Sequence, residues 1–429
     1  MEMVLSLIIF GGCYVLLVLE KWNRALVAGA GGVLMVLAGI YTLDQAFGEY
    51  IDWNTIALLF SMMILVSLAS KTGVFEYIAV AVAQSVEGRP VPLMFMMALI
   101  TAVGSALLDN VTTVLLFAPV LLTMTSRLDL PSTPYLIVLI LSSNIGGTAT
   151  LIGDPPNIMI GQAVKDLTFN DFAINLGPVV LVIFISVMGG LFFFYRKQLH
   201  VEEEKRQQLM NMNASSYLRK DRTLFQCLVV LACTILGFVL HPLLHVELTS
   251  VAMAGALLLM LLTYKEFAVE DVLRNVEWVT LFFFVGLFML VGGLESTGII
   301  DEIARSIIFY TEGDLAKTSL FILWISGILS GFIDNIPFVA AMIPVILEFK
   351  DYGMSNIDPL WWSLALGACL GGNGTLIGAS ANVVVAGLAS GAKQPIKFIE
   401  FFKVGMPIVI FSMVISSIYL YVRYLIFFN

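Results

Sequence analysis

The feature that most constrains the fold is an internal repeat. Adding 225 to a residue number maps the first half of the chain onto the second without a gap over about a hundred positions. The matched pairs include residues of many types: Trp53 and Trp278, Asp109-Asn110 and Asp334-Asn335, Gly146-Gly147 and Gly371-Gly372, Asn157 and Asn382. Chance could copy apolar letters, but it would not copy Asp, Asn, Trp and Gly-Gly at one constant offset. The two halves are therefore predicted to adopt the same fold.

Long apolar runs recur along the whole chain. Hydrophobic residues make up 59% of the 429 positions and charged residues 12%, about half the charge of an average soluble domain. Many of these runs approach the ~20 residues with which a helix crosses a bilayer. We therefore predict an all-α membrane protein with ten transmembrane helices, at 3–19, 24–41, 53–70, 133–164, 174–195, 223–240, 247–263, 278–295, 360–390 and 404–427.

Two further apolar segments, 92–126 and 317–348, are about twice too long for one crossing. Polar residues at their centres favour re-entrant helical hairpins, because irregular backbone at membrane depth is tolerated only where protein or water surrounds it. Amphipathic stretches at 74–88 and 299–312 precede the hairpins and are expected to lie along the membrane interface.

Each half holds five crossings, an odd number, so equivalent elements face opposite sides of the membrane. This arrangement is typical of secondary transporters built from two inverted repeats, with discontinuous helices at the midplane. We expect a first repeat at 1–196, a cytoplasmic linker at 197–222 and a second repeat at 223–429. Loops on the linker's side hold 17 of the 22 Lys and Arg residues, Arg24 among them. The positive-inside rule then places both termini outside a bacterial or archaeal plasma membrane.

The centre of each hairpin carries an Asp-Asn pair, Asp109-Asn110 in the first and Asp334-Asn335 in the second. One interpretation is helix capping, which Asp and Asn do well. However, Asn, Ser or Thr would cap without a charge, and an ionised Asp at the membrane centre costs roughly 2.5–3.5 kcal/mol. Such residues usually mark ion or proton pathways. We therefore predict a binding site at the two tips, with Thr112 and Thr113 in the first.

Glycine and proline interrupt one crossing in each half. In the first half, Gly-Asp-Pro-Pro at 153–156 cannot continue a helix, because each proline lacks a donor and clashes with the preceding turn. Asp154 then caps a new half-helix, and the freed carbonyls and nearby hydroxyls can bind Na⁺. The predicted site residues at the two breaks are Asn144, Gly147, Thr148, Thr150, Asp154 and Asn157, and Gly372, Asn373, Thr375 and Asn382.

The coupling ion is expected to be H⁺ or Na⁺, without any other cofactor. Sodium sites are predicted at two trios of residues: Asp109, Asn110 and Thr148, and Asp334, Asn335 and Asn373. No Lys, Arg or His lies within these motifs beside Asp109, Asp154 or Asp334. Acidic residues alone favour a cation, a proton or a neutral polyhydroxyl solute over an anion. Cys369, in the second break, is either a small apolar filler or a soft ligand for a thiophilic solute.

Several other function classes are disfavoured by what the sequence lacks. The chain has no GxxxxGK[ST] motif and no nucleophile–base constellation, so we expect neither ATP hydrolysis by the chain itself nor an enzyme. The expected partners are the lipid bilayer and a small inorganic or organic solute, and not nucleic acid. A homodimer and a cytoplasmic ATPase partner remain open.

The phrases LLDNVTTVLLFAPV (107–120) and NIGGTATLIGDPPN (144–157) resemble signatures of the arsenite permease and P-protein branch of the citrate transporter-like ion transporter superfamily. A more distant resemblance is to divalent anion–sodium symporters, which have Ser and Thr where this chain has Asp109, Asp154 and Asp334. The resemblance implies a scaffold domain, a mobile transport domain and elevator-type alternating access, with dimers formed through the scaffold in many relatives.

The leading hypothesis is a secondary transporter that exports arsenite or antimonite in exchange for protons. The alternatives are a Na⁺/H⁺ antiporter that uses the same aspartates, and a cation-coupled symporter of carboxylates or other anions. A channel is a further alternative, which helical hairpins with titratable tips disfavour.

Overall fold

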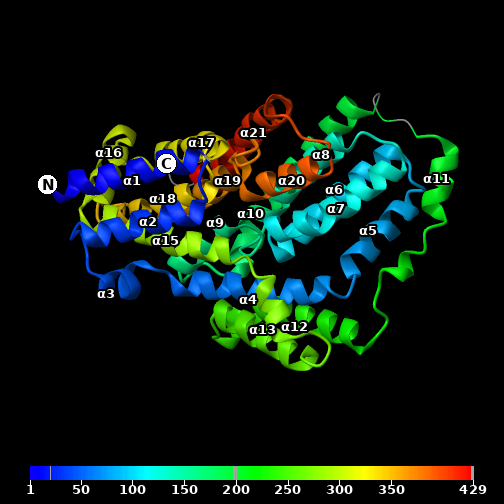
Figure 1. Cartoon of the computed structure of the whole chain (residues 1–429). Coiled ribbons are helices and arrows are strands. Elements are labelled where there is room, and N and C mark those ends of the chain that lie inside the picture. The colour runs from blue at the N-terminus through cyan, green and yellow to red at the C-terminus, as the bar shows by residue number, and fades with distance from the viewer. Residues whose placement is uncertain (20, 197–198, 200, 427–429) are drawn as a thin grey trace.

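The computed structural model describes residues 1–19, 21–196, 199 and 201–426, and these residues form helices and loops without any strand (Figure 1). Eight of the helices are long and apolar enough to cross a membrane, which confirms the predicted all-α membrane fold. Positions 197, 198 and 200 of the predicted linker lie outside the described residues, as does 427 at the end of the last predicted crossing.

Each predicted uninterrupted crossing corresponds to one helix. These helices are α1 (Glu2–Leu19), α2 (Arg24–Leu37), α4 (Trp53–Ser70), α10 (Phe169–Tyr195), α12 (Arg222–Leu244), α13 (Leu248–Thr263), α15 (Trp278–Ser296) and α21 (Phe398–Leu420). The second helix ends earlier than the predicted residue 41, because Gly39 adopts a left-handed conformation with φ 74°. A capping box between Thr42 and Gln45 then begins the short α3 (Leu43–Gln45).

The predicted hairpins and broken helices each appear as two helices. The hairpins are α6 (Pro90–Leu108) with α7 (Asn110–Arg127), and α17 (Leu315–Phe332) with α18 (Asn335–Glu348). The breaks separate α8 (Ser132–Gly147) from α9 (Pro155–Ala163), and α19 (Asp358–Gly371) from α20 (Ser380–Gly391). The residue before each second half-helix is extended in both halves, with φ −145° at Asp154 and φ −151° at Ala379. The two breaks therefore share one backbone geometry.

The helices pack into two groups, which run across both repeats. The first, here called the scaffold group, comprises α1, α2, α4, α12, α13 and α15; α2 packs along α15, and α13 packs along α4. The second, here called the core group, comprises both hairpins, both broken helices, α10 and α21. In Figure 1, α12 and α13 lie against α4 along the lower edge, and the core group lies above them. This division agrees with the scaffold and transport units that the family resemblance implies.

Two short helices connect the groups. The first arm, α5 (Val74–Ser85), follows α4 and packs on the first hairpin, and the second arm, α16 (Ile299–Thr311), follows α15 and packs on the second hairpin. They coincide with the predicted amphipathic stretches. Each begins after a left-handed glycine, Gly73 or Gly298, with φ 74° in both cases. Glycine is needed at these bends because a Cβ makes the left-handed conformation unfavourable.

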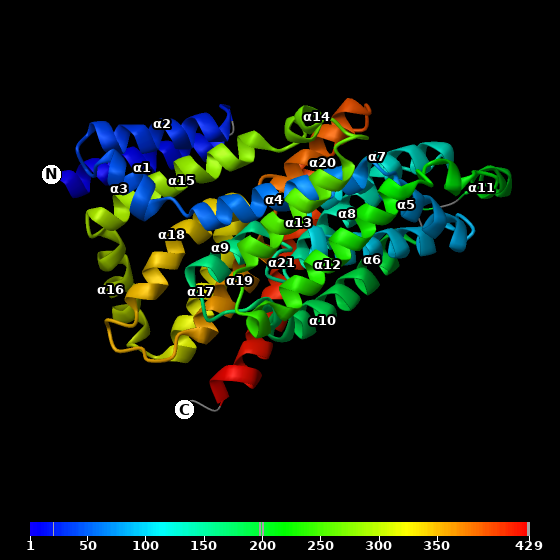
Figure 2. The same ribbon diagram turned by 90° about the horizontal axis from the view of Figure 1, so that it is seen from below.

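The described part of the linker lies at the end of the molecule opposite the start of α1 (Figures 1 and 2). Its helix α11 (Glu203–Met210) docks on the first hairpin through Lys205, whose Nζ lies 2.7 Å from Asp129 Oδ2. The Gln84 side chain of the first arm donates a hydrogen bond of 2.7 Å to the Met212 carbonyl. The linker is therefore held against the first hairpin and its arm.

The linker also covers one of the two arm hinges. The Arg219 N–H donates a hydrogen bond of 3.0 Å to the Thr72 carbonyl, which holds the chain over the turn before α5. A Cβ added at Gly73 would overlap the Tyr217 carbonyl, whereas one added at Gly298 would meet no described atom within 4 Å. The hinge before the first arm is thus covered, and its counterpart in the second half is open.

Candidate transport site

An asparagine holds each broken helix together. The Asn157 amide donates hydrogen bonds to the carbonyls of Thr148 (3.2 Å) and Thr150 (2.9 Å). Its repeat mate Asn382 donates to the carbonyls of Gly372 (2.7 Å) and Thr375 (2.8 Å). These carbonyls lie where the regular helical hydrogen bonds stop, and buried carbonyls need partners; the Thr375 carbonyl also accepts from the Gly378 N–H (3.2 Å). The predicted ligands Asn157 and Asn382 therefore use their donors to stabilise the backbone of the breaks.

The first helix of each hairpin docks on the half-helix before the break. Ser105 Oγ donates to the Ser143 carbonyl at 2.7 Å, and its mate Ser330 Oγ donates to the Ala368 carbonyl at 2.6 Å. The helices approach so closely that a Cβ on Gly146 would overlap the Ala102 backbone. The hairpin tips are thereby fixed next to the breaks in both halves.

A buried amide network joins the two halves at their centre. Asn144 accepts a hydrogen bond from Asn110 Nδ2 (3.3 Å). The Asn144 amide donates to the side-chain oxygens of Asn373 (3.0 Å) and Asn382 (2.9 Å) in the opposite half. All four side chains are buried. The predicted residues Asn110, Asn144, Asn373 and Asn382 thus come together in one neutral cluster.

Asp109 forms its hydrogen bonds locally. Its carboxylate accepts from the Thr112 N–H (2.8 Å) and from Thr112 Oγ1 (2.6 Å), so it caps α7. Its φ of 114° is rare for a residue with a side chain, and strain of this kind gathers at functional sites. Nearby, the buried atoms Asn110 Oδ1 and Thr113 Oγ1 have no hydrogen-bond partner among the described residues. The first tip therefore combines capping with unused oxygen acceptors.

Asp154 lies at the first break and contacts the second hairpin. It is 1% exposed, and both of its oxygens lie 3.4 Å from Asn335 Nδ2. Cys369, the repeat mate of Asn144, lies close by and donates to Asn157 Oδ1 at 3.5 Å.

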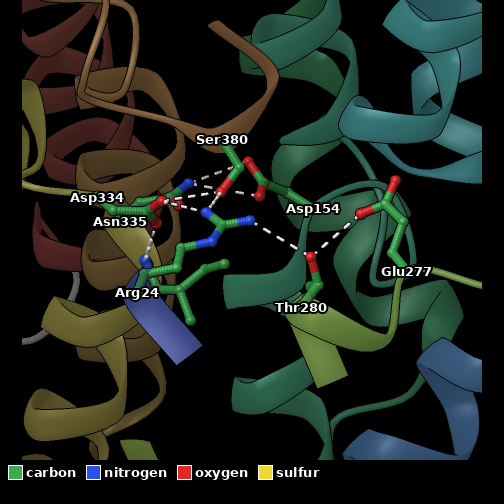
Figure 3. A network of polar contacts seen from close by, with 8 residues as sticks. Arg24, Asp154, Glu277, Thr280, Asp334, Asn335 and Ser380 are labelled. Atoms are coloured by element: carbon green, nitrogen blue, oxygen red, sulfur yellow. Dashed lines mark hydrogen bonds and ion pairs between the residues drawn. The ribbon is translucent and has the colours of Figure 1, made fainter. Parts of the chain in front are cut away.

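Asp334 differs from its mate because a basic residue contacts it. Arg24 Nη1 at the start of α2 lies 3.2 Å from Asp334 Oδ2, and Ser380 Oγ donates to the same oxygen at 2.8 Å (Figure 3). The sequence motifs contain no basic residue, and Arg24 was assigned to a loop and not to the site, so this contact was missed. Ser380 was also missed, although it stands where the first half has Pro155. The replacement of Pro155 by a serine at its repeat mate was the sequence signal that could have pointed to Ser380.

The remaining predicted residues lie at the breaks and contact the backbone nearby. Thr148 Oγ1 donates to the Asn144 carbonyl (2.7 Å), and Thr150 Oγ1 donates to the Ala106 carbonyl (2.5 Å). Gly147 and Gly372 allow the chain to pass closely over the backbone of Gly153 and Gly378. Thr375 Oγ1 accepts from the Ile377 N–H.

The two predicted sodium trios stay a prediction. In this structure Thr148 Oγ1 donates to the Asn144 carbonyl, and Asn373 Oδ1 accepts from the Asn144 amide. The described His, Cys, Asp and Glu side chains include no group of three that could hold a metal ion, but the trios also rely on Asn and Thr oxygens. The site thus consists of three carboxylates, one guanidinium and a neutral amide cluster.

Comparison with known proteins decides the family. The sequence profile described as "Citrate transporter" matches residues 14–367, which is most of the chain. This chain belongs to the citrate transporter family. As a member of that family it is a multi-pass membrane protein and a secondary transporter, in agreement with the transporter prediction.

Relatives of this family member are found in bacteria and in mammals. It is 41% identical to an uncharacterised transporter of Mycobacterium tuberculosis, over 98% of each chain. It is 40% identical to the 46 kDa membrane protein of Mycobacterium leprae, over 99% of each chain. It is 33% identical to the P protein of Homo sapiens, a match that covers 99% of this chain and 60% of that protein. The predicted resemblance to P proteins is thereby confirmed.

The fold of this family member is also found in a solved structure. The YdaH transporter of Alcanivorax borkumensis, whose topology is described as unusual, aligns over 98% of each chain with a TM-score of 0.57 and 13% identity. At that identity the likeness shows the fold alone.

Proposed function

We propose that this transporter couples substrate movement to protons, which bind at Asp109, Asp154 and Asp334. The observation that carries the proposal is the burial of carboxylates without a counter-charge. Asp154 is 1% exposed and Asp109 9% exposed, and neither forms an ion pair within the described part of the chain. Burying an ionised carboxylate without a counter-charge carries a large desolvation free energy. Each must therefore carry a proton or another cation while the site is closed.

A proton fits the surroundings of Asp154 better than a metal ion. The polar group from the second hairpin that faces it is the Asn335 amide, which is a donor, whereas a metal ion needs acceptor oxygens. A carboxylate next to an N–H donor can bind and release a proton, because a proton, unlike a metal ion, needs no further oxygen ligands.

We also propose elevator-type alternating access, in which the core group moves against the scaffold group. The two groups are joined by the arms α5 and α16, and each arm starts at a glycine bend that can act as a hinge. In this proposal the hairpins are re-entrant, because their tips meet the breaks inside the protein, where irregular backbone is tolerated.

The substrate that we propose is a small neutral hydroxylated solute, of which arsenite and antimonite are the first to test. The buried cluster of Asn110, Asn144, Asn373 and Asn382 offers neutral donors and acceptors, and Asn373 Nδ2 has no partner among the described residues. Cys369 places a soft sulfur beside this cluster. The family's name makes a carboxylate such as citrate the second candidate to test.

A Na⁺/H⁺ antiporter is a second candidate function. It is favoured by Asn110 Oδ1 and Thr113 Oγ1, two buried oxygens of the first tip without a partner among the described residues. Hard oxygen atoms of this kind suit Na⁺, and Asp109 lies in the same tip.

The orientation that we propose puts the linker in the cytoplasm and both termini outside. This orientation is supported by the helix α11 of the linker lying at the end of the molecule opposite the start of α1. The loops on the linker's side keep 16 of the 22 basic residues once Arg24 is assigned to the interior. A bacterial or archaeal plasma membrane remains our proposed location.

The test is transport in proteoliposomes under an imposed pH gradient, with arsenite, antimonite, Na⁺ and citrate offered one at a time. We expect proton flux linked to one solute, and Asp109→Asn, Asp154→Asn and Asp334→Asn should each abolish it. Asp351→Asn is the matched control, because Asp351 follows the other end of the second hairpin helix α18 and is exposed. If all three aspartate variants kept the wild-type rate and pH dependence, proton coupling at these residues would be refuted.

A further inference from the structure

We propose that Arg24 is a counter-charge fixed to the scaffold group, which pairs with Asp334 whenever that aspartate carries no coupling cation and thereby prevents the empty core group from moving. This inference rests on the proposed role of Asp334 as a coupling group. It assigns to Arg24 a positioning role in obligatory coupling, because a carrier that moves while empty dissipates the gradient.

Four contacts hold the Arg24 guanidinium at this place. Nη1 lies 3.2 Å from Asp334 Oδ2 and contacts Ser380 Oγ, and Nη2 lies 3.3 Å from Thr280 Oγ1 (Figure 3). The guanidinium also lies 5.2 Å from the centre of the Phe283 ring. Two of these contacts are made to the scaffold helix α15 and two to the core group.

The position of Arg24 is unfavourable for its own helix. Asn23 caps α2, so that Arg24 is the first residue of the helix and lies at the positive end of its dipole. A basic residue there weakens the helix unless an anion lies close to it. Asp334 supplies that anion from α18, which shows that the charge serves the contact between the two groups rather than the helix.

The scaffold holds Arg24 rigidly. A Cβ on Gly286 of α15 would overlap the backbone of Ala28 and Gly29 of α2, so the two helices are in backbone contact and must move as one body. Thr280 and Phe283 lie on the same helix α15 and face the guanidinium. Asp334 and Ser380 belong to the core group. A displacement of the core group along the scaffold must therefore break the pair.

Within the described residues, an arginine–aspartate pair of this kind is found at the second hairpin tip and not at the first. The mate of Arg24 is Thr249, which contacts Gln162 and the Asn54 carbonyl through its hydroxyl. In the part of the chain that the structure describes, Asp109 and Asp154 have no ion pair. Arg24 therefore acts on Asp334 alone among the three aspartates.

The pair borders a cavity. A cavity of about 310 Å³ is lined by Arg24, Asp334 and Ser380 together with apolar side chains such as Trp22 and Phe332. The Arg24 and Asp334 side chains are 31% and 20% exposed. A proton that binds Asp334 Oδ2 removes its negative charge and hence the attraction of Arg24, which frees the core group to move.

The experiment measures proton entry into proteoliposomes that contain a pH-sensitive dye, with the membrane potential clamped and no other transported solute. The wild-type protein should leak little, because the deprotonated carrier is held by Arg24. The variant Arg24→Gln should leak at least about fivefold faster, since a pair worth about 1 kcal/mol changes a rate by that factor. The double variant Arg24→Gln/Asp334→Asn should leak more slowly than Arg24→Gln, because one of the three proposed proton-binding carboxylates is gone. The matched control Arg274→Gln removes an exposed arginine between the scaffold helices α13 and α15, and it should leak like wild type.

The outcomes separate this inference from the proposed function. If Arg24→Gln leaked no faster than wild type, or if the double variant leaked as fast as Arg24→Gln, the inference would be overturned. Loss of solute-coupled flux in Asp334→Asn, tested separately, would still support the proposed function. Should Arg24→Gln fail to fold, Ser380→Ala removes the hydroxyl that contacts both partners and should raise the leak; an unchanged leak would overturn the inference as well.

Discussion

The contact between α6 and α8 gives the sharpest test of how the site is built. Gly146 lies at the end of α8, and a Cβ added there would lie 2.5 Å from Ala102 Cα and 2.6 Å from its carbonyl carbon. Both are backbone atoms of α6, so no side-chain rotation can relieve the overlap. The substitution Gly146→Ala must therefore push α6 away by about 1 Å, since ordinary contacts need about 3.4–4 Å.

The magnitude follows from two opposing effects. Overpacking a close contact destabilises by about 1–3 kcal/mol, and the upper end applies because the obstacle is backbone. Alanine gains up to about 1 kcal/mol over glycine in a helix. We expect a net destabilisation of about 2 kcal/mol. The same shift would lengthen the Ser105–Ser143 hydrogen bond of 2.7 Å and displace the tip at Asp109, so coupled transport should fall as well.

The assay is the half-life of the folded protein in detergent at one temperature, together with transport after reconstitution. A loss of about 2 kcal/mol corresponds to a rate about 30 times faster if it appears wholly in unfolding. Gly371→Ala, the repeat mate, meets the Gly327 backbone at slightly longer distances and should lose less. Gly189→Ala in α10 meets nothing within 4 Å among the described atoms and should gain stability. If Gly146→Ala were as stable as Gly189→Ala, the close docking of α6 on α8 would be refuted.

Three further predictions concern the breaks, the first tip and the linker. Asn382→Ala should destabilise the protein by about 1 kcal/mol more than Asn157→Ala, because Asn382 also accepts a 2.9 Å bond from Asn144 whereas Asn157 accepts only from a thiol; equal half-lives in detergent would contradict this. Thr113→Val should leave stability unchanged or raise it, because the Thr113 hydroxyl has no partner among the described residues, but it should lower transport if that oxygen binds the transported ion. Thr101→Val is the matched control, because the Thr101 hydroxyl donates to a carbonyl of its own helix. Finally, the hydrogen bond from Lys205 holds the pKa of Asp129 below its usual range, so this contact strengthens linker docking above the usual Asp pKa and is lost as the pH falls through the lowered value. The protection of the α11 amides from hydrogen exchange, measured relative to an unstructured peptide at the same pH, should therefore be high at pH 7 and fall in acid, and in Asp129→Asn it should already be low at pH 7.

Much of the architecture could be predicted because its signals are local in the sequence. Gly-Asp-Pro-Pro must interrupt a helix wherever it occurs, and the constant offset of 225 transfers that conclusion to the second half, where no proline marks the break. The hairpins and arms followed from the length and periodicity of apolar runs. These features are set by the conformational preferences and the hydrophobicity of short segments.

The contacts between side chains were harder to predict. Arg24 and Asp334 are 310 positions apart, and the rotation of α2 about its axis is set by packing against α15, which periodicity does not report. For the same reason Asn157 and Asn382 were predicted as ion ligands, although their amides bind the carbonyls of the breaks. A polar residue at a break can bind an ion or hydrogen-bond a backbone carbonyl, and only the three-dimensional structure distinguishes the two roles.

The covered hinge at Gly73 has a consequence for the balance between the two faces of the transporter. If the halves were identical, the inward-open and outward-open states would be related by the repeat and would have equal free energies. The linker segment at Tyr217 packs on the glycine bend at Gly73 and leaves its counterpart at Gly298 open, so under the proposed elevator movement its contacts differ between the two states. A difference of 1.4 kcal/mol shifts such an equilibrium tenfold. If the core group moves as proposed, the segment that joins the duplicated halves is expected to shift the balance between the two faces.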